Sequence, residues 1–216
     1  MTAPDATGYR GFHDLASAQV RGRDYEIDIR RRPGSEVAII APHGGRIEDG
    51  TSELARAIAG DDFHLYLFEG TRPSLNYVAL HLTSHRFDEP ECLSLIAECR
   101  YVVALHGCEG TDPRVLLGGR DRALKAALDR HIANAGFSTE TEGHRFPGEH
   151  PNNVCNRGLH GRGVQLEVTH PLRRSPGCAA RLAAAARSAL VSYLEGPDAP
   201  AITTINASSA GATGLP

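Results

Sequence analysis

The sequence contains no tryptophan, and aromatic residues of all kinds make up only 6% of its 216 residues. Proteins that bind single-stranded nucleic acid stack bases on aromatic side chains, and this chain has few to offer. The formal net charge is −3, so no excess of positive charge attracts nucleic acid or an anionic membrane. Composition therefore predicts neither nucleic acid nor a membrane as a partner.

The sequence also lacks paired cysteine motifs, since its five cysteines include no CxxC pair. That argues against a cysteine-rich structural zinc site, and the odd number argues against a disulfide framework. No basic-then-apolar signal opens the chain, and no apolar run approaches the ~20 residues of a membrane span. We expect reduced thiols and a cytoplasmic location at synthesis, with release by lysis if a phage encodes the protein.

What the chain does contain is an alternation of strand and helix patterns. Strands are expected at 24–30, 37–41, 63–70, 77–84, 101–106, 115–119, 137–142 and 163–168. Helices are expected at 51–60, 89–99, 120–136 and 176–194, the first capped by Thr51 or Ser52 and ended by Gly60. A long Gly-, Pro- and Asn-rich loop at 143–162 interrupts this alternation.

The order of these elements predicts the α/β class, with a mixed, mainly parallel central sheet between two layers of helices. The alternating patterns at 24–30 and 77–84 suggest antiparallel members of that sheet. We expect one domain over residues 1–196, followed by a small, polar and flexible tail at 197–216.

Two histidines each follow an apolar strand pattern and precede a glycine. His43 ends the segment VAIIAPH, and His106 ends YVVALH. Glu48 follows His43 by five residues, across Gly44 and Gly45, which allow a tight turn back. Two histidines and a carboxylate are a common protein ligand set of hydrolytic zinc sites, which leave one position for water. The spacing alone is a weak signal, since a histidine beside glycines is more often an ordinary turn residue. His81 and His85, near another predicted strand end, are second-rank candidates.

Glu167 lies between Leu166 and Val168 in the strand pattern GVQLEV. A carboxylate within so apolar a strand is costly to bury unless it is paired or functional. The alternative is that Glu167 points to the solvent face of an alternating strand, and the pattern alone does not choose between the two.

Five segments in order resemble the poly-gamma-glutamate hydrolase family, carboxypeptidase-like zinc peptidases of phages and bacteria. They are HGGRIEDGTSE (43–53), LHLTSHRFDEP (80–90), LHG (105–107), HPNNVCNR (150–157) and GVQLEV (163–168). The resemblance spans most of residues 9–174 and implies a carboxypeptidase-like fold. It implies one zinc ion per chain bound by His43, Glu48 and His106, with Glu167 as general base for hydrolysis of a gamma-glutamyl amide.

The resemblance also implies that the pair Asn156 and Arg157 binds substrate, because carboxypeptidase-like enzymes hold substrate carboxylates with such a pair. Arg157 is also expected to assist catalysis by sharing the charge that develops on the carbonyl oxygen. The implied partner is a polyanionic gamma-glutamyl polymer, and Arg120, Arg145 and Arg162 are further candidates to line its groove. Members of one zinc fold can cleave peptide, capsule or cell-wall amides, so the resemblance leaves the amide itself open.

Two other functions compete with this one. The chain could be a polymer-binding or phage-associated protein that keeps the fold without catalysis, although the expected positions all hold suitable residues. It could also be a cysteine hydrolase in which Cys108 is the nucleophile and His106 its base, but residues two apart on a strand end do not usually face each other.

Overall fold

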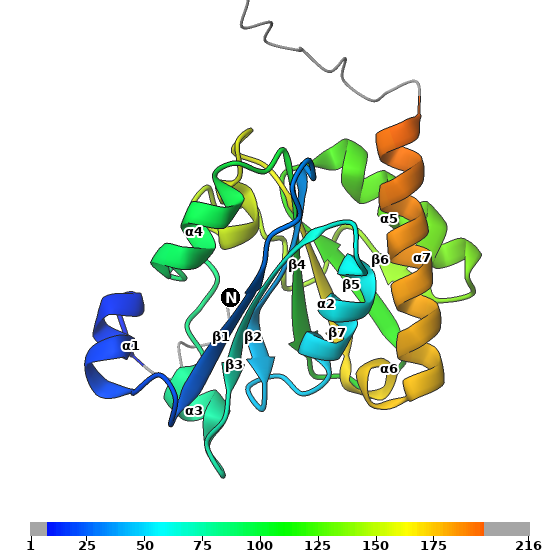
Figure 1. Cartoon of the computed structure of the whole chain (residues 1–216). Coiled ribbons are helices and arrows are strands. Elements are labelled where there is room, and N and C mark those ends of the chain that lie inside the picture. Colours follow the sequence, from blue (N-terminus) through cyan, green and yellow to red (C-terminus); the bar gives the residue numbers. More distant parts are fainter. Residues whose placement is uncertain (1–7, 197–216) are drawn as a thin grey trace, which may run out of the picture.

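The computed structural model describes residues 8–196, which form a central sheet between two layers of helices (Figure 1). The predicted tail at 197–216 lies outside the described residues. The sheet has seven strands in the order β1-β3-β2-β4-β7-β5-β6. Their bounds are β1 Tyr25–Arg30, β2 Val37–Gly45, β3 His64–Gly70, β4 Tyr101–Cys108, β5 Arg114–Gly118, β6 Ser138–Glu140 and β7 Val164–Thr169. The predicted fold class, a mixed sheet between helices, is confirmed.

The middle of the sheet is parallel and its margins are not. Strands β3, β2, β4 and β7 run parallel to one another, whereas β1 is antiparallel to β3 and β5 is antiparallel to β7. The parallel strands β2, β4 and β7 are apolar along most of their length because both of their faces are covered. Their carboxyl ends meet at one edge of the sheet, which is where sites form in open α/β sheets.

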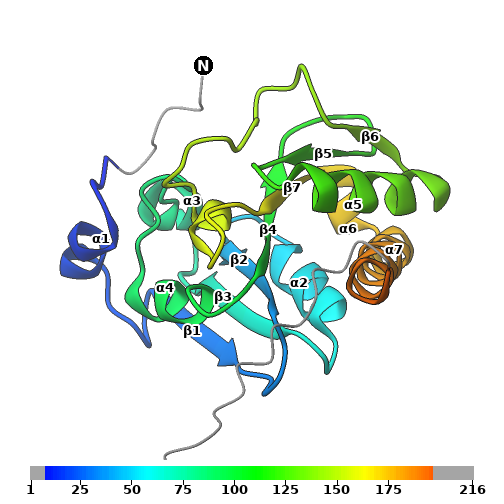
Figure 2. The same ribbon diagram turned by 90° about the horizontal axis from the view of Figure 1, so that it is seen from above.

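The helices divide between the two faces of the sheet, as the end-on view shows (Figure 2). Helices α2, α5 and α7 pack on one face through a core of mainly aliphatic side chains. The other face carries α1, α3, α4 and the short 3-10 helix η1, with a second core that contains Tyr66, Phe68 and Phe87. The helices are α1 Phe12–Ala18, α2 Thr51–Ala59, α3 Asn76–Leu80, α4 Pro90–Ile96, α5 Arg122–Asn134, η1 Val154–Arg157, α6 His170–Arg174 and α7 Pro176–Glu195. None of the helices in this described part is long and apolar enough to cross a bilayer.

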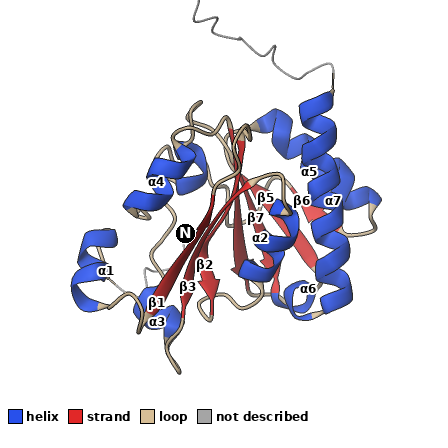
Figure 3. Cartoon of the chain, in the orientation of Figure 1, coloured by secondary structure: helices blue, strands red, loops and turns tan. Residues whose placement is uncertain are grey.

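Three local predictions differ from the structure (Figure 3). The segment predicted as a strand at 77–84 contains helix α3 instead. Strand β1 already occupies the edge of the sheet beside β3, so this segment has no strand to pair with, and Leu80 and Leu82 are buried in the second core. Helices α1 and α6 were not expected, because neither is long enough to show a helical period clearly. Helix α2 begins after Gly50, so that Thr51 and Ser52 lie inside the helix and do not cap it.

Candidate metal centre

Strand β2 ends in an irregularity that turns His43 toward the second core. The pairing of β2 with β3 shifts between Ala41 and Gly44, and Gly45 has a positive φ of 61°. A Cβ on Gly45 would lie 2.7 Å from the carbonyl oxygen of Gly70, so only glycine fits this approach. The chain then turns back, and the Glu48 amide donates to the His43 carbonyl at 3.0 Å. The predicted return of Glu48 toward His43 is therefore present.

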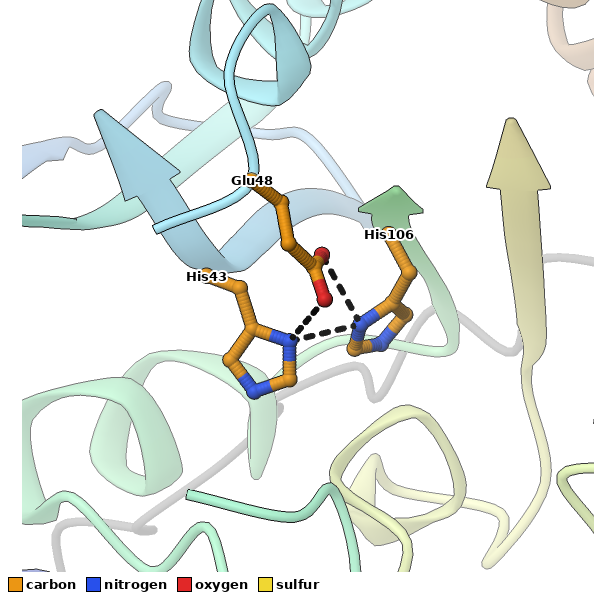
Figure 4. Close-up of side chains that lie close together, drawn as sticks. All are labelled: His43, Glu48 and His106. Carbon is orange, nitrogen blue, oxygen red and sulfur yellow. Dashed lines mark hydrogen bonds and ion pairs between the residues drawn. The ribbon is translucent and has the colours of Figure 1, made fainter. Parts of the chain in front are cut away.

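His106 comes to the same place from the neighbouring strand. It lies near the end of β4, and its side chain points to the same face as Val102 and Ala104, which belong to the second core. The next residue, Gly107, donates its amide hydrogen to Glu48 Oε2 at 2.7 Å. The three side chains of His43, Glu48 and His106 point toward one another and are almost completely buried (Figure 4).

The spacing of these three groups fits a metal ion. His43 Nδ1 lies 3.1 Å from Glu48 Oε1 and 3.1 Å from His106 Nδ1, and His106 Nδ1 lies 3.8 Å from Glu48 Oε2. Ligands about 2.0–2.1 Å from a tetrahedral zinc ion lie roughly 3.3 Å from one another. Two imidazole nitrogens that face each other also need a proton or a cation between their lone pairs. In the described part of the chain, these are the residues whose ligand atoms gather in this way.

The far side of each imidazole ring has a partner that orients it. His43 Nε2 lies 2.8 Å from the Leu82 carbonyl oxygen. A carbonyl oxygen can only accept a hydrogen bond, so Nε2 is the nitrogen that carries the hydrogen. The lone pair of His43 Nδ1 then faces the centre of the cluster. His106 Nε2 lies 3.3 Å from Ser84 Oγ. Such partners are typical of metal-binding histidines, because they fix the tautomer and the plane of the ring.

Charges within the cluster move the pKa values in different directions. Burial raises the pKa of the Glu48 carboxyl, but attraction to His43 and hydrogen bonds from His43 and His81 outweigh it, and this pKa falls well below its usual range. Burial, followed by repulsion from His43, lowers the pKa of His106 to about 3. For His43 burial is outweighed by attraction to Glu48, which raises its pKa. An ionised Glu48 and a neutral His106 are the forms that a metal ion needs.

Glu167 lies beside the cluster on the next strand. It is the register partner of His106 in the β4–β7 pair, so the two side chains lie on the same face of the sheet. Glu167 is 6% exposed, which rules out the alternative that it points to solvent. Gln165 Nε2 donates to its Oε1 at 3.2 Å. Burial, followed by repulsion from Glu48, raises the pKa of Glu167 well above its usual range, while Arg145 and Arg173 oppose this.

Asn156 lies in η1 and holds loop backbone. Its Oδ1 accepts from the amides of Arg120 and Gly163 at 3.2 and 3.1 Å. Its Nδ2 donates to the carbonyls of Gly148 and His150 at 2.7 and 3.0 Å. Both N–H donors and both oxygen lone pairs of this side-chain amide are thus used in hydrogen bonds to the protein backbone. Its role in binding a substrate carboxylate stays a prediction.

Arg157 ends η1, and its positive charge acts on the buried thiol of Cys92 in α4. The arginines whose charges act on Glu167 are Arg145, in the 143–162 loop, and Arg173, in α6. The catalytic and substrate-binding roles of Arg157 therefore also stay predictions.

His81 is a close neighbour that sequence reasoning ranked second. Its ring stacks on His43 with centroids 4.0 Å apart, and its Nε2 lies 3.5 Å from Glu48 Oε1. Tyr77 in turn stacks on His81 at 4.4 Å. The LHLTSH segment indicated His81 and His85 as candidates, because both lie near a predicted strand end. The spacing alone could not decide which of the two faces the site.

Cys108 is buried near the same edge, and burial, followed by repulsion from Glu167, raises the pKa of its thiol to about 12. A nucleophilic cysteine must be a thiolate near neutral pH, so this environment argues against the cysteine hydrolase alternative.

A groove of about 1190 Å³ lies over the turn between β2 and α2, and its lining includes neighbours of Glu48 in the chain but none of His43, Glu48, His106 and Glu167. It runs between the end of β2, helix α2, the chain around α3, and the junction of α6 and α7, and Tyr77 forms part of its wall. Three arginines and two acidic residues line it: Arg46, Arg173, Arg174, Asp49 and Glu53. Leu75 and Val78 on its rim are exposed, so the groove offers both apolar and cationic surface.

The fold and this cluster define a class of protein: an α/β protein with a candidate mononuclear metal centre at the carboxyl edge of its sheet. Comparison with known proteins narrows the class to one family, because residues 9–187 match the family model described as poly-gamma-glutamate hydrolase. The chain belongs to the poly-gamma-glutamate hydrolase family, a family of enzymes, as the five sequence segments predicted.

Relatives agree with this assignment. The chain is 38% identical to UPF0714 protein YmaC of Bacillus subtilis strain 168 over 169 residues, which cover 77% of this chain and 71% of YmaC. It is 37% identical to YndL of the same organism, over 77% of this chain and 66% of YndL. The matched part therefore spans about two thirds of the length of these relatives.

Two solved structures share the fold. A bacteriophage poly-gamma-glutamate hydrolase superposes with a TM-score of 0.81 at 29% identity, covering 88% of this chain and 99% of the other. Zinc-free apo YndL superposes with a TM-score of 0.75 at 31% identity, covering 88% and 98%.

Proposed function

We propose that this protein is a zinc-dependent amidohydrolase that cleaves gamma-glutamyl amide bonds of a poly-gamma-glutamate-like polymer. The observation that carries the proposal is the buried convergence of His43, Glu48 and His106, with a buried Glu167 as register partner of His106. Two findings support zinc as the metal: the family to which the chain belongs, and the solved structure of YndL, which is its zinc-free apo form.

In this proposal His43 and His106 bind the metal through Nδ1 and Glu48 binds it through a carboxylate oxygen. The Leu82 carbonyl and the Gly107 amide keep these donors aimed at one point. The chemistry that zinc supplies when bound is polarisation of a carbonyl and a fall in the pKa of water toward about 7.

Glu167 is the proton carrier of the proposed reaction. One of its carboxylate oxygens accepts the proton of the attacking water and then delivers it to the nitrogen of the leaving amine. Its raised pKa makes the ionised carboxylate a stronger proton acceptor, and the positive charge of a bound metal would favour that ionised form before the water attacks. Gln165 orients the side chain through its bond to Oε1.

The polymer would carry one free carboxylate per residue, so cationic groups must lie along its path. Arg46 and Arg174 line the groove at the β2–α2 turn, and the exposed Arg145 in the 143–162 loop acts on Glu167 through its charge. We place one arm of the bound polymer in this groove, where the apolar wall contacts its methylene groups and the arginines contact its carboxylates.

The experiment is incubation of chelator-treated and zinc-loaded protein with poly-gamma-glutamate, followed by mass analysis of the products. Shorter glutamate oligomers are expected from the zinc-loaded protein alone. Binding of the polymer without cleavage by zinc-loaded protein would favour the polymer-binding alternative. Loss of activity with a thiol alkylating agent, but not with a chelator, would instead support Cys108 as the nucleophile.

A further inference from the structure

Arg173 contacts the backbone next to each proposed reactive residue. It lies near the end of α6, which directly follows β7. Its Nε donates to the carbonyl of Val168 at 2.9 Å, and its Nη1 donates to the carbonyl of Asp49. Val168 is the residue after Glu167, and Asp49 is the residue after Glu48.

The same guanidinium covers Gly107, the residue after His106. A Cβ built on Gly107 would lie 2.7 Å from both Nε and Nη2 of Arg173, so the flat side chain occupies the space that any other residue would need. Gly107 also donates the hydrogen bond that holds Glu48 Oε2. One side chain thus contacts three chain segments that arrive from three different elements.

We infer that Arg173 is the positioning residue of the metal centre, because its guanidinium fixes the backbone directly after Glu48, His106 and Glu167 at one point. This inference rests on the proposed zinc site. Only arginine can perform the task, since a planar fork offers several donors in fixed directions and a flat face that packs on glycine. A lysine at this position donates from a single nitrogen and leaves Gly107 uncovered.

The chain contains a matched control at the opposite end of α2. Arg187 in α7 donates from Nη1 to the carbonyls of Ile58 and Ala59, at 3.0 and 2.9 Å, and its guanidinium covers Gly60. Arg187 therefore resembles Arg173 in its contacts with backbone carbonyls and a glycine. The difference is location: Arg187 binds the carboxyl end of α2, whereas Arg173 binds Asp49, before the amino end of that helix.

The experiment measures the zinc dissociation constant of Arg173→Met and Arg187→Met by competition with a chromogenic chelator. We expect zinc to bind about 10- to 100-fold more weakly to Arg173→Met, as for other residues that support metal ligands. Arg187→Met should unfold at a lower temperature than the wild type but bind zinc as the wild type does. If both variants weaken zinc binding equally, or neither does, the inference is wrong.

A second variant guards against failure of Arg173→Met to fold. Gly107→Ala keeps the arginine in the chain but displaces its guanidinium, so it should also weaken zinc binding. In the Arg173→Ala background the same Gly107→Ala change should have a smaller effect, because the new methyl group meets no guanidinium. Gly107→Ala that binds zinc as tightly as the wild type, or equal effects of this change in both backgrounds, would contradict the inference. Wild-type protein that binds no zinc would overturn the proposed function together with this inference, whereas normal wild-type binding with unaffected variants overturns this inference alone.

Discussion

At the scale of single residues, the site holds two buried glutamates whose pKa values move in opposite directions. Glu48 faces His43, His81 and the Gly107 amide, all of which favour its ionised form. Glu167 accepts a hydrogen bond from Gln165, and burial together with the negative charge of Glu48 raises its pKa. Environments that push two pKa values apart assign different roles to chemically identical groups. The ligand role therefore suits Glu48 and the proton-transfer role suits Glu167.

The first prediction at this scale concerns Glu167→Gln. This change keeps the size and polarity of the side chain but removes its ability to take a proton. We expect kcat for poly-gamma-glutamate to fall by about 10²- to 10⁴-fold, the usual contribution of a general base, while zinc content stays near that of the wild type. Kinetics and elemental analysis of the same preparation provide the measurement. The control is Glu98→Gln. Glu98 is exposed, and its Oε2 lies 3.5 Å from Arg31 Nη1. Unchanged turnover in Glu167→Gln would remove Glu167 from the mechanism.

The second prediction is a pH dependence of stability in metal-free protein. An unfolded glutamate has a pKa near 4.3, whereas the pKa of Glu167 in the folded protein is raised. Between these values the folded state retains a proton that the unfolded state has released, so stability falls as pH rises through this window. Glu167→Gln lacks this titration, and its stability relative to wild type should grow from about pH 4 upward, by at most about 1.4 kcal/mol per pH unit. Urea unfolding of chelator-treated proteins at several pH values measures it, and a constant difference would contradict it.

At the scale of elements, the connection from β2 to α2 determines where two of the ligands lie. The register shift in β2 and the turn after Gly45 direct His43 and Glu48 to one point. Side chains of α2 then fix the turn: Ser52 Oγ accepts from the Gly45 amide at 2.9 Å, and Thr51 Oγ1 donates to the Glu48 carbonyl at 2.8 Å. This explains why these two residues do not cap the helix, since their hydroxyl groups serve the preceding turn.

The prediction at this scale concerns Gly45→Ala. The positive φ and the close Gly70 carbonyl leave no room for a Cβ, so we expect a loss of roughly 1–3 kcal/mol in the free energy of unfolding. Zinc affinity should fall as well, because the strain lies between two proposed ligands. Urea unfolding and chelator competition measure the two effects. Gly177→Ala in α7 is the control, since a Cβ there meets no atom within 4 Å and alanine favours the helix. Equal stability of the two variants would contradict the prediction.

At the scale of the whole molecule, the site lies where the parallel strands end and the second core begins. Its groups come from β2, the β2–α2 turn, β4 and β7, and residues 82 and 84 hold the imidazole rings from the other side. A metal ion bound at this point would join segments that are distant in sequence. Because such a site does not exist in the unfolded chain, binding free energy adds to folding free energy.

The prediction at this scale is that zinc stabilises the fold. At a free zinc concentration 100 times the dissociation constant, the free energy of unfolding should rise by about 2.7 kcal/mol, which corresponds to an increase of roughly 5–10 °C in Tm. Thermal unfolding of chelator-treated protein with and without zinc measures the change. Magnesium should have little effect, because it prefers oxygen ligands. His106→Ala should lose the zinc effect, and an equal stabilisation of this variant would contradict the proposed ligand set.

Much of the fold could be predicted from the sequence because its strongest patterns are local. The continuous apolar runs of β2, β4 and β7 predict strands that are covered on both faces, and the alanine-rich segment of α7 predicts a helix. The segment at 77–84 failed because its alternation suits either a strand or a short helix beside a core. The choice between strand and helix depended on whether an edge of the sheet was free, and β1 occupies the edge beside β3.

The sequence by itself determined the chemistry that is possible: which imidazoles and carboxylates the chain carries, and that His43, His106 and Glu167 stand at or near the ends of apolar strands. Only the tertiary structure decided which of them meet. It brought Glu167 opposite His106, stacked His81 on His43, and committed Asn156 to loop backbone. It also placed Arg173 against three segments. The physical reason is range: strand and helix patterns arise from neighbours along the chain, whereas a buried polar cluster depends on strand order and register, which no local pattern encodes.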